Sequence, residues 1–177
     1  TGLCAGSYTV IATDMTGCLD SAEVIIGEPD SIAVTITPTG VSCNGDCDGW
    51  AVAVASGGNP PFTYQWNDPN STLNDTVTDL CAGIYSVVVT DSLGCIGTGS
   101  TVISEPLPLL LIDSVLNITC GGECDGIAGV LVQGGTPSYT YQWDDPDDQT
   151  TPFATGLCAG TYQVVVTDAN GCMDSIS

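Results

Sequence analysis

The sequence predicts an all-β protein made of tandem two-sheet sandwiches that are stapled by disulfide bonds. Three observations support this fold class: the chain repeats with a constant period, short runs of alternating apolar and polar residues lie between turn-forming residues, and cysteines recur at fixed phases of the repeat. No stretch has the periodicity of an amphipathic helix.

The repeat has a period of 77 residues. The segment TGLCAGSYTV begins at Thr1 and returns in modified form at Thr78 and Thr155, and a segment that ends at Trp66 ends again at Trp143. No residue is inserted or deleted between the copies, which indicates that each copy is one structural unit. We expect the chain to be part of a longer tandem array.

Proline marks the expected boundaries between repeats. Glu28-Pro29 and Glu105-Pro106 have the same phase, and proline interrupts a strand because it lacks the backbone N–H donor. These positions divide the chain into the C-terminal half of a preceding repeat at 1–29, a complete repeat at 30–106, and a second repeat at 107–177 whose last strand is truncated.

The complete repeat contains several runs that are typical of strands. The clearest runs are 32–37, 50–55, 62–66, 84–90 and 95–103, and the type I turn pattern Asp91-Ser92-Leu93-Gly94 joins the last two. About seven short strands in one repeat predict a β-sandwich with immunoglobulin-like architecture.

One of these runs shows which side faces the core. Tyr85, Val87 and Val89 share a face of the run 84–90, and their copies keep this face apolar, so we expect it to be buried. Tyr85 follows a tight turn at the start of the strand, as in a tyrosine corner, and Trp66 lies where such sandwiches often carry a core tryptophan.

The composition excludes several functional classes. The chain has 21 Asp and Glu residues, no Lys, Arg or His, and a net charge of −21. Nucleic acids and anionic membranes require cationic side chains, so neither is an expected partner. The chain lacks a histidine base, a lysine nucleophile and an arginine clamp, and no carboxylate pair has an aromatic cleft signature, so we expect no enzyme activity. No apolar run is long enough for membrane insertion.

Ten regularly spaced cysteines indicate an oxidising compartment, so we expect an extracellular protein. The four cysteines of a repeat allow three connectivities. The strand between Cys81 and Cys95 spans roughly 23 Å, too far for these two to bond. If all four bond within the repeat, Cys43 and Cys47 each take one of them. Because Cys47 lies beside the start of the second strand, we prefer Cys43–Cys95 with Cys47–Cys81.

The same reasoning applies to the other copies. In the second repeat it gives Cys120–Cys172 with Cys124–Cys158, while Cys4 and Cys18 should bond to cysteines of the preceding repeat. Closing a loop of about 50 residues contributes roughly 4 kcal/mol in the chain-entropy model, which is comparable with the net stability of so small a core. A zinc site that begins at Cys-x3-Cys is the weaker alternative, because no histidine is present.

Three motifs together resemble the SprB-type repeat of Bacteroidota surface adhesins: CNGDCDG, SGGNPPFTYQW, and LCAG-x-Y-x-V-x-x-TD-x-x-GC. The resemblance covers the whole chain. It implies very large secreted proteins with many repeats at the cell surface, some of them adhesins moved by the gliding machinery, and it implies no catalytic residues. Many repeats of this family have only the first and last of the four cysteines, which favours the pair Cys43–Cys95.

Two kinds of modification or ligand site are candidates. Asp-Ser or Asp-Thr is followed by an aliphatic residue six times, which is similar to an O-glycosylation signal of Bacteroidota; the alternative is turn formation. The candidate residues are Ser21, Ser31, Thr76, Ser92, Ser114 and Ser175. Alternating oxygen-bearing residues resemble half of a calcium loop, at Asp46 and Asp48 and again at Glu123 and Asp125. The two ligand sets differ, which favours solvated turns over calcium.

We therefore expect a structural and adhesive region of a large secreted surface protein that forms an extracellular fibre or filament. Short proline-containing connections and like-charge repulsion oppose its collapse. The alternative is a carbohydrate- or protein-binding module, which requires exposed aromatic residues clustered at one end of each repeat. The expected partners are neighbouring repeats, identical chains in a filament, and covalently attached glycans, and no cofactor is expected other than the calcium alternative.

Overall fold

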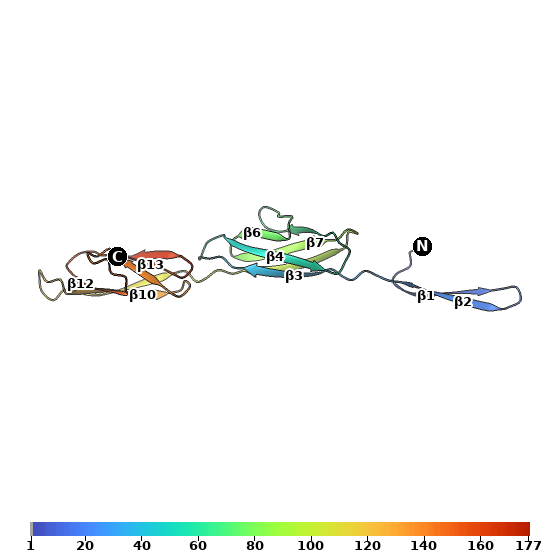
Figure 1. Cartoon of the computed structure of the whole chain (residues 1–177), viewed down its shortest axis with the longest axis horizontal. Coiled ribbons are helices and arrows are strands. Elements are labelled where there is room, and N and C mark those ends of the chain that lie inside the picture. Colours follow the sequence, from blue (N-terminus) through green and yellow to red (C-terminus); the bar gives the residue numbers. More distant parts are fainter. Residues whose placement is uncertain (1) are drawn as a thin grey trace.

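The computed structural model describes residues 2–177, and Thr1, the first residue of the expected half-repeat, lies outside the described residues. Within 2–177 the chain forms strands, turns and loops but no α-helix, so no helix there could cross a membrane. Three bodies lie in a row along the long axis: a hairpin at the N-terminal end, a first sandwich, and a second sandwich (Figure 1). The predicted all-β fold class is confirmed.

The strands follow the repeat. The hairpin consists of β1 (Gly6–Thr13) and β2 (Leu19–Ile26). The first sandwich consists of β3 (Ala33–Thr39), β4 (Gly49–Ser56), β5 (Thr63–Trp66), β6 (Thr76–Leu80), β7 (Gly83–Thr90) and β8 (Ile96–Ile103). The second sandwich consists of β9 (Leu110–Leu116), β10 (Gly126–Gln133), β11 (Thr140–Trp143), β12 (Phe153–Leu157), β13 (Val164–Thr167) and β14 (Met173–Ile176).

Each sandwich has two antiparallel three-stranded sheets. In the first sandwich, β4 lies between β3 and β6, and β7 lies between β5 and β8; the second sandwich repeats this order. The same order relates strands A, B and E and strands C, F and G of an immunoglobulin domain, so the repeats are immunoglobulin-like. Residues 30–106 form six strands where about seven were expected, because residues 67–75 form a loop between β5 and β6.

The core of the first sandwich lies between its two sheets. Trp66 of β5 and Val87 and Val89 of β7 are buried and pack with Ala51 and Ala53 of β4. Exposed residues alternate with them along each strand, as the period of two requires. The second core contains Leu111, Val130, Trp143, Ala154, Leu157, Val164 and Val166.

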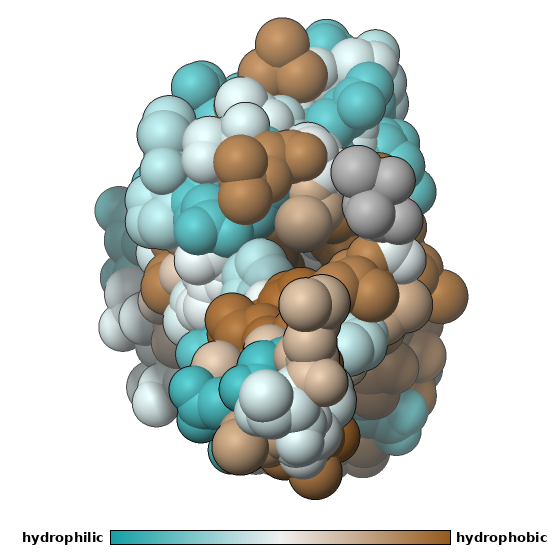
Figure 2. All heavy atoms as spheres, turned by 90° about the vertical axis from the view of Figure 1, so that its right-hand side faces the viewer, coloured by the Kyte–Doolittle hydropathy of each residue, from teal (hydrophilic) through white to brown (hydrophobic). Residues whose placement is uncertain are grey.

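The β1–β2 hairpin corresponds to the last two strands of a repeat, without the opposite sheet. Val10 has the same phase as Val87, yet Val10 is 64% exposed whereas Val87 is 0% exposed. Figure 2 views this end of the molecule and shows apolar residues at the surface among polar ones. Whether this position belongs to a core therefore depends on the covering sheet.

Tyr85 forms the expected tyrosine corner. Its hydroxyl donates to the carbonyl oxygen of Cys81 at 3.2 Å. The equivalent bonds run from Tyr8 to Cys4 at 2.9 Å and from Tyr162 to Cys158 at 3.3 Å. This bond ties the turn to the strand that follows it, so the cysteine in the turn has a fixed position.

A close approach of β8 to the segment that enters β3 joins the two sheets along one edge. A Cβ atom on Gly97 would lie 2.6 Å from Cγ2 of Ile32 and 2.9 Å from its carbonyl oxygen. Only glycine therefore fits at position 97 without displacing the backbone of the neighbouring segment.

Candidate functional site

The candidate site is the junction between the two sandwiches. Three segments meet there: the loop 40–48 before β4, the connection 104–109 before β9, and the turn 168–172 between β13 and β14. The loop and the turn belong to different repeats, and the head-to-tail arrangement brings them together (Figure 1).

Asp48 closes the loop 40–48. Its carboxylate accepts hydrogen bonds from the backbone N–H of Ser42 at 2.9 Å and from the Ser42 hydroxyl at 2.5 Å, and the N–H of Asp46 donates to the carbonyl of Cys43 at 3.1 Å. The bond from the Ser42 hydroxyl is the main cause that lowers the pKa of Asp48, because it stabilises the ionised carboxylate. The loop is consequently a compact turn.

The connection between the sandwiches is held against this loop. The side-chain amide of Asn44 donates to the carbonyl of Pro106 at 3.0 Å, and the N–H of Gly45 donates to the carboxylate of Glu105 at 3.0 Å. The N–H of Val41 also donates to the carbonyl of Ser104 at 2.9 Å. These bonds restrain the chain at the point where a hinge would otherwise lie.

A disulfide bond crosses the junction. Cys43 of the loop bonds with Cys172 of the turn, with their Cα atoms 5.7 Å apart and a sequence separation of 129. Beside it, the amide of Asn170 donates to the carbonyl of Ser42 at 2.9 Å and to the hydroxyl of Thr136 at 3.2 Å. The two sandwiches are therefore linked by a disulfide bond as well as by the polypeptide connection.

The expected pairs Cys43–Cys95 and Cys120–Cys172 are wrong. Cys172 occupies in the second repeat the position that Cys95 occupies in the first. Cys43 therefore bonds with the cysteine at the expected position, but in the following repeat and not in its own. The physical reason is the compact loop. Cys43 stays at the end of the sandwich where β3 ends, whereas Cys95 lies at the opposite end, between β7 and β8.

The other cysteines form bonds within each sandwich or remain free. Cys47 bonds with Cys81 and Cys124 bonds with Cys158, which are the pairs expected from the sequence. Each of these bonds joins the loop before the second strand to the turn of the tyrosine corner. The free and exposed cysteines are Cys4, Cys18, Cys95 and Cys120. Bonds from Cys4 and Cys18 to a preceding repeat remain a prediction.

Asp168 organises the turn that carries Cys172. Its buried carboxylate accepts hydrogen bonds from the backbone N–H groups of Thr136, Asn170 and Cys172 at 2.7, 2.9 and 2.9 Å. Burial is the largest influence on the pKa of Asp168 and acts to raise it, but the hydrogen bonds together hold that pKa below its usual value. In the first sandwich, Asp91 accepts the equivalent bonds from Asn59, Leu93 and Cys95.

The calcium candidates lie in the loops before β4 and β10. The Asp48 carboxylate bonds with Ser42, and the Asp125 carboxylate accepts from the N–H and hydroxyl of Thr119 at 3.0 and 2.6 Å. Asp46 and Glu123 lie in the same two loops and are exposed. Nowhere in 2–177 do three His, Cys, Asp or Glu side chains gather as metal ligands would. The Asp48 and Asp125 carboxylates thus satisfy donors of their own loops.

The glycosylation candidates are spread over the molecule. Five are exposed and one, Thr76 at the start of β6, is half-buried. The exposed candidates are Ser21, Ser31, Ser92, Ser114 and Ser175.

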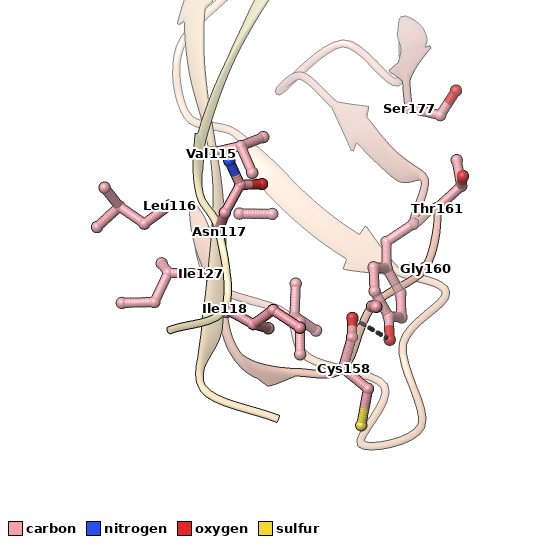
Figure 3. Close-up of a pocket in the computed structure, with 14 residues that line it drawn as sticks. Val115, Leu116, Asn117, Ile118, Ile127, Cys158, Gly160, Thr161 and Ser177 are labelled. Carbon is pink, nitrogen blue, oxygen red and sulfur yellow. Dashed lines mark hydrogen bonds between the residues drawn. The ribbon is translucent and has the colours of Figure 1, made fainter. Parts of the chain in front are cut away.

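A groove of about 400 Å³ lies in the second sandwich. It runs between Val115 and Ile118 on one side and the turn from Cys158 to Thr161 on the other, with Ser177 at its edge (Figure 3). In the first sandwich, the corresponding place is filled by the buried Ile103 at the end of β8. The groove thus corresponds to the place that the end of a strand occupies in the first sandwich.

Each sandwich contains a segment that matches a known family of repeats. The family model described as the SprB repeat matches the chain at residues 33–71 and again at 112–148. Two segments of the chain, one in each sandwich, thus match the SprB repeat. Each match starts in the first strand of a sandwich and ends in the loop after the core tryptophan. The resemblance drawn from the sequence motifs is confirmed.

The chain also aligns with solved structures. A structure described as the basis of Dscam isoform specificity is 14% identical, with 96% of this chain and 52% of that chain aligned and a TM-score of 0.33. A tetra-tandem repeat from the extending region of a large adhesion protein is 15% identical, with coverages of 98% and 56% and a TM-score of 0.30. The chain thus spans about half the length of these structures. No curated protein matches the chain.

Proposed function

We propose that these SprB repeats form a structural and adhesive region of a large secreted surface protein, in which sandwiches joined head to tail make an extracellular fibre. The observation that carries the proposal is the junction, where the Cys43–Cys172 bond and the hydrogen bonds to Pro106 and Glu105 hold two repeats together. A covalent bond across a short connection limits bending and transmits tension.

The disulfide also defines the path of a pulling force. Tension along the chain reaches Cys43 before it reaches β4, and the bond passes it directly to Cys172. The strands between the two cysteines, β4 to β13, therefore remain unloaded, whereas β3 and β14 lie outside the bypassed segment and bear the force. Resistance to force matters for a protein that holds a cell to a surface, whereas an enzyme would not need it.

Charge and redox chemistry support an extracellular location at the cell surface. The three disulfide bonds of this structure are typical of proteins in an oxidising environment. With a net charge of −21 and no cationic side chain, neighbouring fibres repel one another unless a cation or an attached group intervenes. The absence of Lys and Arg also removes every trypsin cleavage site.

The second candidate, a carbohydrate- or protein-binding module, receives less support. It needs aromatic side chains gathered at one end of a repeat. Among the aromatic residues of 2–177, only Trp50 and Phe153 are exposed, and they lie on strands of different repeats, β4 and β12. Tyr64 and Tyr85 pack against the core.

We also propose that glycans are attached at the Asp-Ser and Asp-Thr sites, because five of the six hydroxyl groups belong to exposed residues. Intact-mass measurement of the protein from its source tests this proposal. A mass equal to that of the bare polypeptide would remove it.

Electron microscopy of the native assembly tests the fibre. The proposal predicts a thin rod with one bead per repeat, whose length does not change when the ionic strength is raised. Flexible beads that collapse in salt would contradict the proposal, and a broad lattice of side-by-side chains would replace the single-chain fibre by a filament of many chains.

A further inference from the structure

The Cys43–Cys172 bond joins the loop of one repeat to the turn of the next. The turn cysteine of the first repeat and the loop cysteine of the second, Cys95 and Cys120, are left unbonded. Cys120 has the phase of Cys43, and Cys95 has the phase of Cys172. Both are free and exposed. Each sandwich thus has a bonding position at both ends, and only the positions that face each other across the described junction are joined.

The loop around Cys120 has the same shape as the loop around Cys43. Asp125 accepts from the N–H and hydroxyl of Thr119, as Asp48 does from Ser42, and the N–H of Glu123 donates to the carbonyl of Cys120 at 3.1 Å. The Cys124–Cys158 bond anchors this loop to the sandwich, as Cys47–Cys81 anchors the other. The loop is therefore formed before any partner is bound.

The turn around Cys95 likewise matches the turn around Cys172. The N–H of Cys95 donates to the Asp91 carboxylate at 2.9 Å, and the N–H of Asp91 donates to the carbonyl of Cys95 at 3.0 Å. The corresponding bonds of Asp168 and Cys172 both measure 2.9 Å. Neither cysteine needs a new backbone conformation to bond.

A buried donor at the Cys95 end supports the same reading. The Nδ2 atom of Asn59 is buried and finds no hydrogen-bond partner among the described residues. Its equivalent in the second sandwich is Thr136, which lies at the junction and accepts a hydrogen bond from Asn170. At the junction it is Asn170, beside Thr136, that donates to the Ser42 carbonyl of the neighbouring loop. Leu93 has the phase of Asn170 in the first sandwich, so Asn59 is the side-chain amide at the corresponding place there.

We propose that Cys95 and Cys120 are inter-repeat disulfide sites, so that every pair of adjacent SprB repeats is joined as Cys43 and Cys172 are. Cys120 bonds with the Cys172-type turn of the following repeat, and Cys95 bonds with the Cys43-type loop of the preceding repeat. In each case two thiols form one S–S bond and release two protons and two electrons. The electrons reduce the disulfide of a thiol–disulfide oxidoreductase to its dithiol.

The resulting bonds would interlock along the array. Cys120 lies within the loop closed by Cys43 and Cys172, so the loop that begins at Cys120 overlaps the preceding one. No repeat then lies outside a disulfide-closed loop, and tension passes from bond to bond. This inference rests on the proposed function, in which successive repeats of one chain form the fibre, and it adds the bonds that join them.

An extended chain tests the inference. Ser177 has the phase of Ser100, so a copy of residues 101–177 appended after Ser177 continues the repeat without a break. The present chain has four free cysteines. After refolding in a glutathione redox buffer with a thiol–disulfide oxidoreductase, the extended chain should again have four, because Cys120 and the appended Cys172 consume each other while the appended Cys120 is left free. Two additional free thiols would overturn the inference.

Peptide mapping and matched variants make the result specific. Peptic digestion without reduction should yield a peptide with Cys120 bonded to the appended Cys172, and any other partner for Cys120 contradicts the proposal. Cys120→Ser should raise the thiol count of the extended chain by one, whereas Cys18→Ser should lower it by one and leave the cross-link intact.

The protein isolated from its source provides a second measurement that needs no refolding. In a non-reducing peptic map, Cys95 and Cys120 should both appear in cross-linked peptides, and alkylation of either one before reduction would refute the inference. The thiol results do not depend on the rod seen by microscopy, so this inference and the proposed fibre can fail separately.

Discussion

Removal of the junction disulfide should lengthen the chain under force by a defined amount. In the double variant Cys43→Ser, Cys172→Ser, no disulfide bypasses the whole segment between these positions, which has a sequence separation of 129. The two internal disulfides still bypass 34 residues each, which leaves 61 residues free to extend. At about 3.5 Å per residue, the fully unfolded variant should be about 210 Å longer than the wild type.

The measurement is single-molecule force spectroscopy with handles at both termini in non-reducing buffer. Reduction of the variant should then release the remaining bypassed residues and add about 240 Å. The Cys4→Ser, Cys18→Ser variant removes two free cysteines and serves as the matched control, which should extend as the wild type does. If the junction variant and the wild type reach the same length, the junction disulfide does not bear the load.

Four further outcomes follow from the structure. Val87→Ala should lower the free energy of unfolding by about 2 kcal/mol in urea titrations, while Val10→Ala at the same phase of the exposed hairpin should change it little; equal losses would contradict the assigned cores. Tyr85→Phe should cost roughly 1 kcal/mol, measured in the same way, because one hydrogen bond to the turn is lost; an unchanged stability would show that the tyrosine corner contributes nothing. The folded-state pKa of Asp91 lies below its unfolded value of about 3.9, so its stabilising effect is complete above that pH and is lost as the pH falls through the folded pKa. Asp91→Asn should therefore flatten the acid limb of a stability-against-pH curve, and a parallel curve would refute this role. Addition of EDTA should leave the melting temperature unchanged, since the loop carboxylates bond with their own backbone, and a clear drop would restore the calcium site.

The highly acidic chain remains compact although its charge is not balanced. No ion pair is available to offset the charge, because the chain has no Lys, Arg or His. Buried carboxylates such as Asp68 and Asp168 are satisfied by backbone N–H groups instead, at the turns that hold strands together. The disulfide bonds add to this by restricting the unfolded chain, and closure of a loop as long as that between Cys43 and Cys172 is worth roughly 5 kcal/mol in the chain-entropy model.

Much of the fold was predictable because its determinants are local. The alternation at Tyr85, Val87 and Val89 assigns one face to the core, and the structure buries Val87 and Val89 there and packs Tyr85 against them. The turn that begins at Asp91 has the expected bond from the N–H of Gly94 to its carbonyl, at 3.1 Å. The expectation of about seven strands was too high, because Asp68 accepts a hydrogen bond from Thr72 and fixes the segment after β5 as a loop.

The disulfide sites show where local reasoning ends. The sequence identified a cysteine beside the end of the first strand and another in the last turn, and these two positions do bond. The error concerned which repeat supplies the second one. The sequence did contain a signal. Cys43 and Cys47 lie only four residues apart, so in a compact loop one of them can bond within its own repeat while the other faces a neighbouring repeat.

The sequence alone determined the period, the two-sheet repeat and the residues of its core, since these follow from alternation and turn chemistry within a few residues. It could not determine the partner of Cys43, because Cys95 and Cys172 occupy the same phase and are equivalent in any pattern of repeats. Only the tertiary structure made that choice, since a disulfide needs two Cα atoms within about 6 Å and the head-to-tail packing places Cys172, from the next repeat, at that distance.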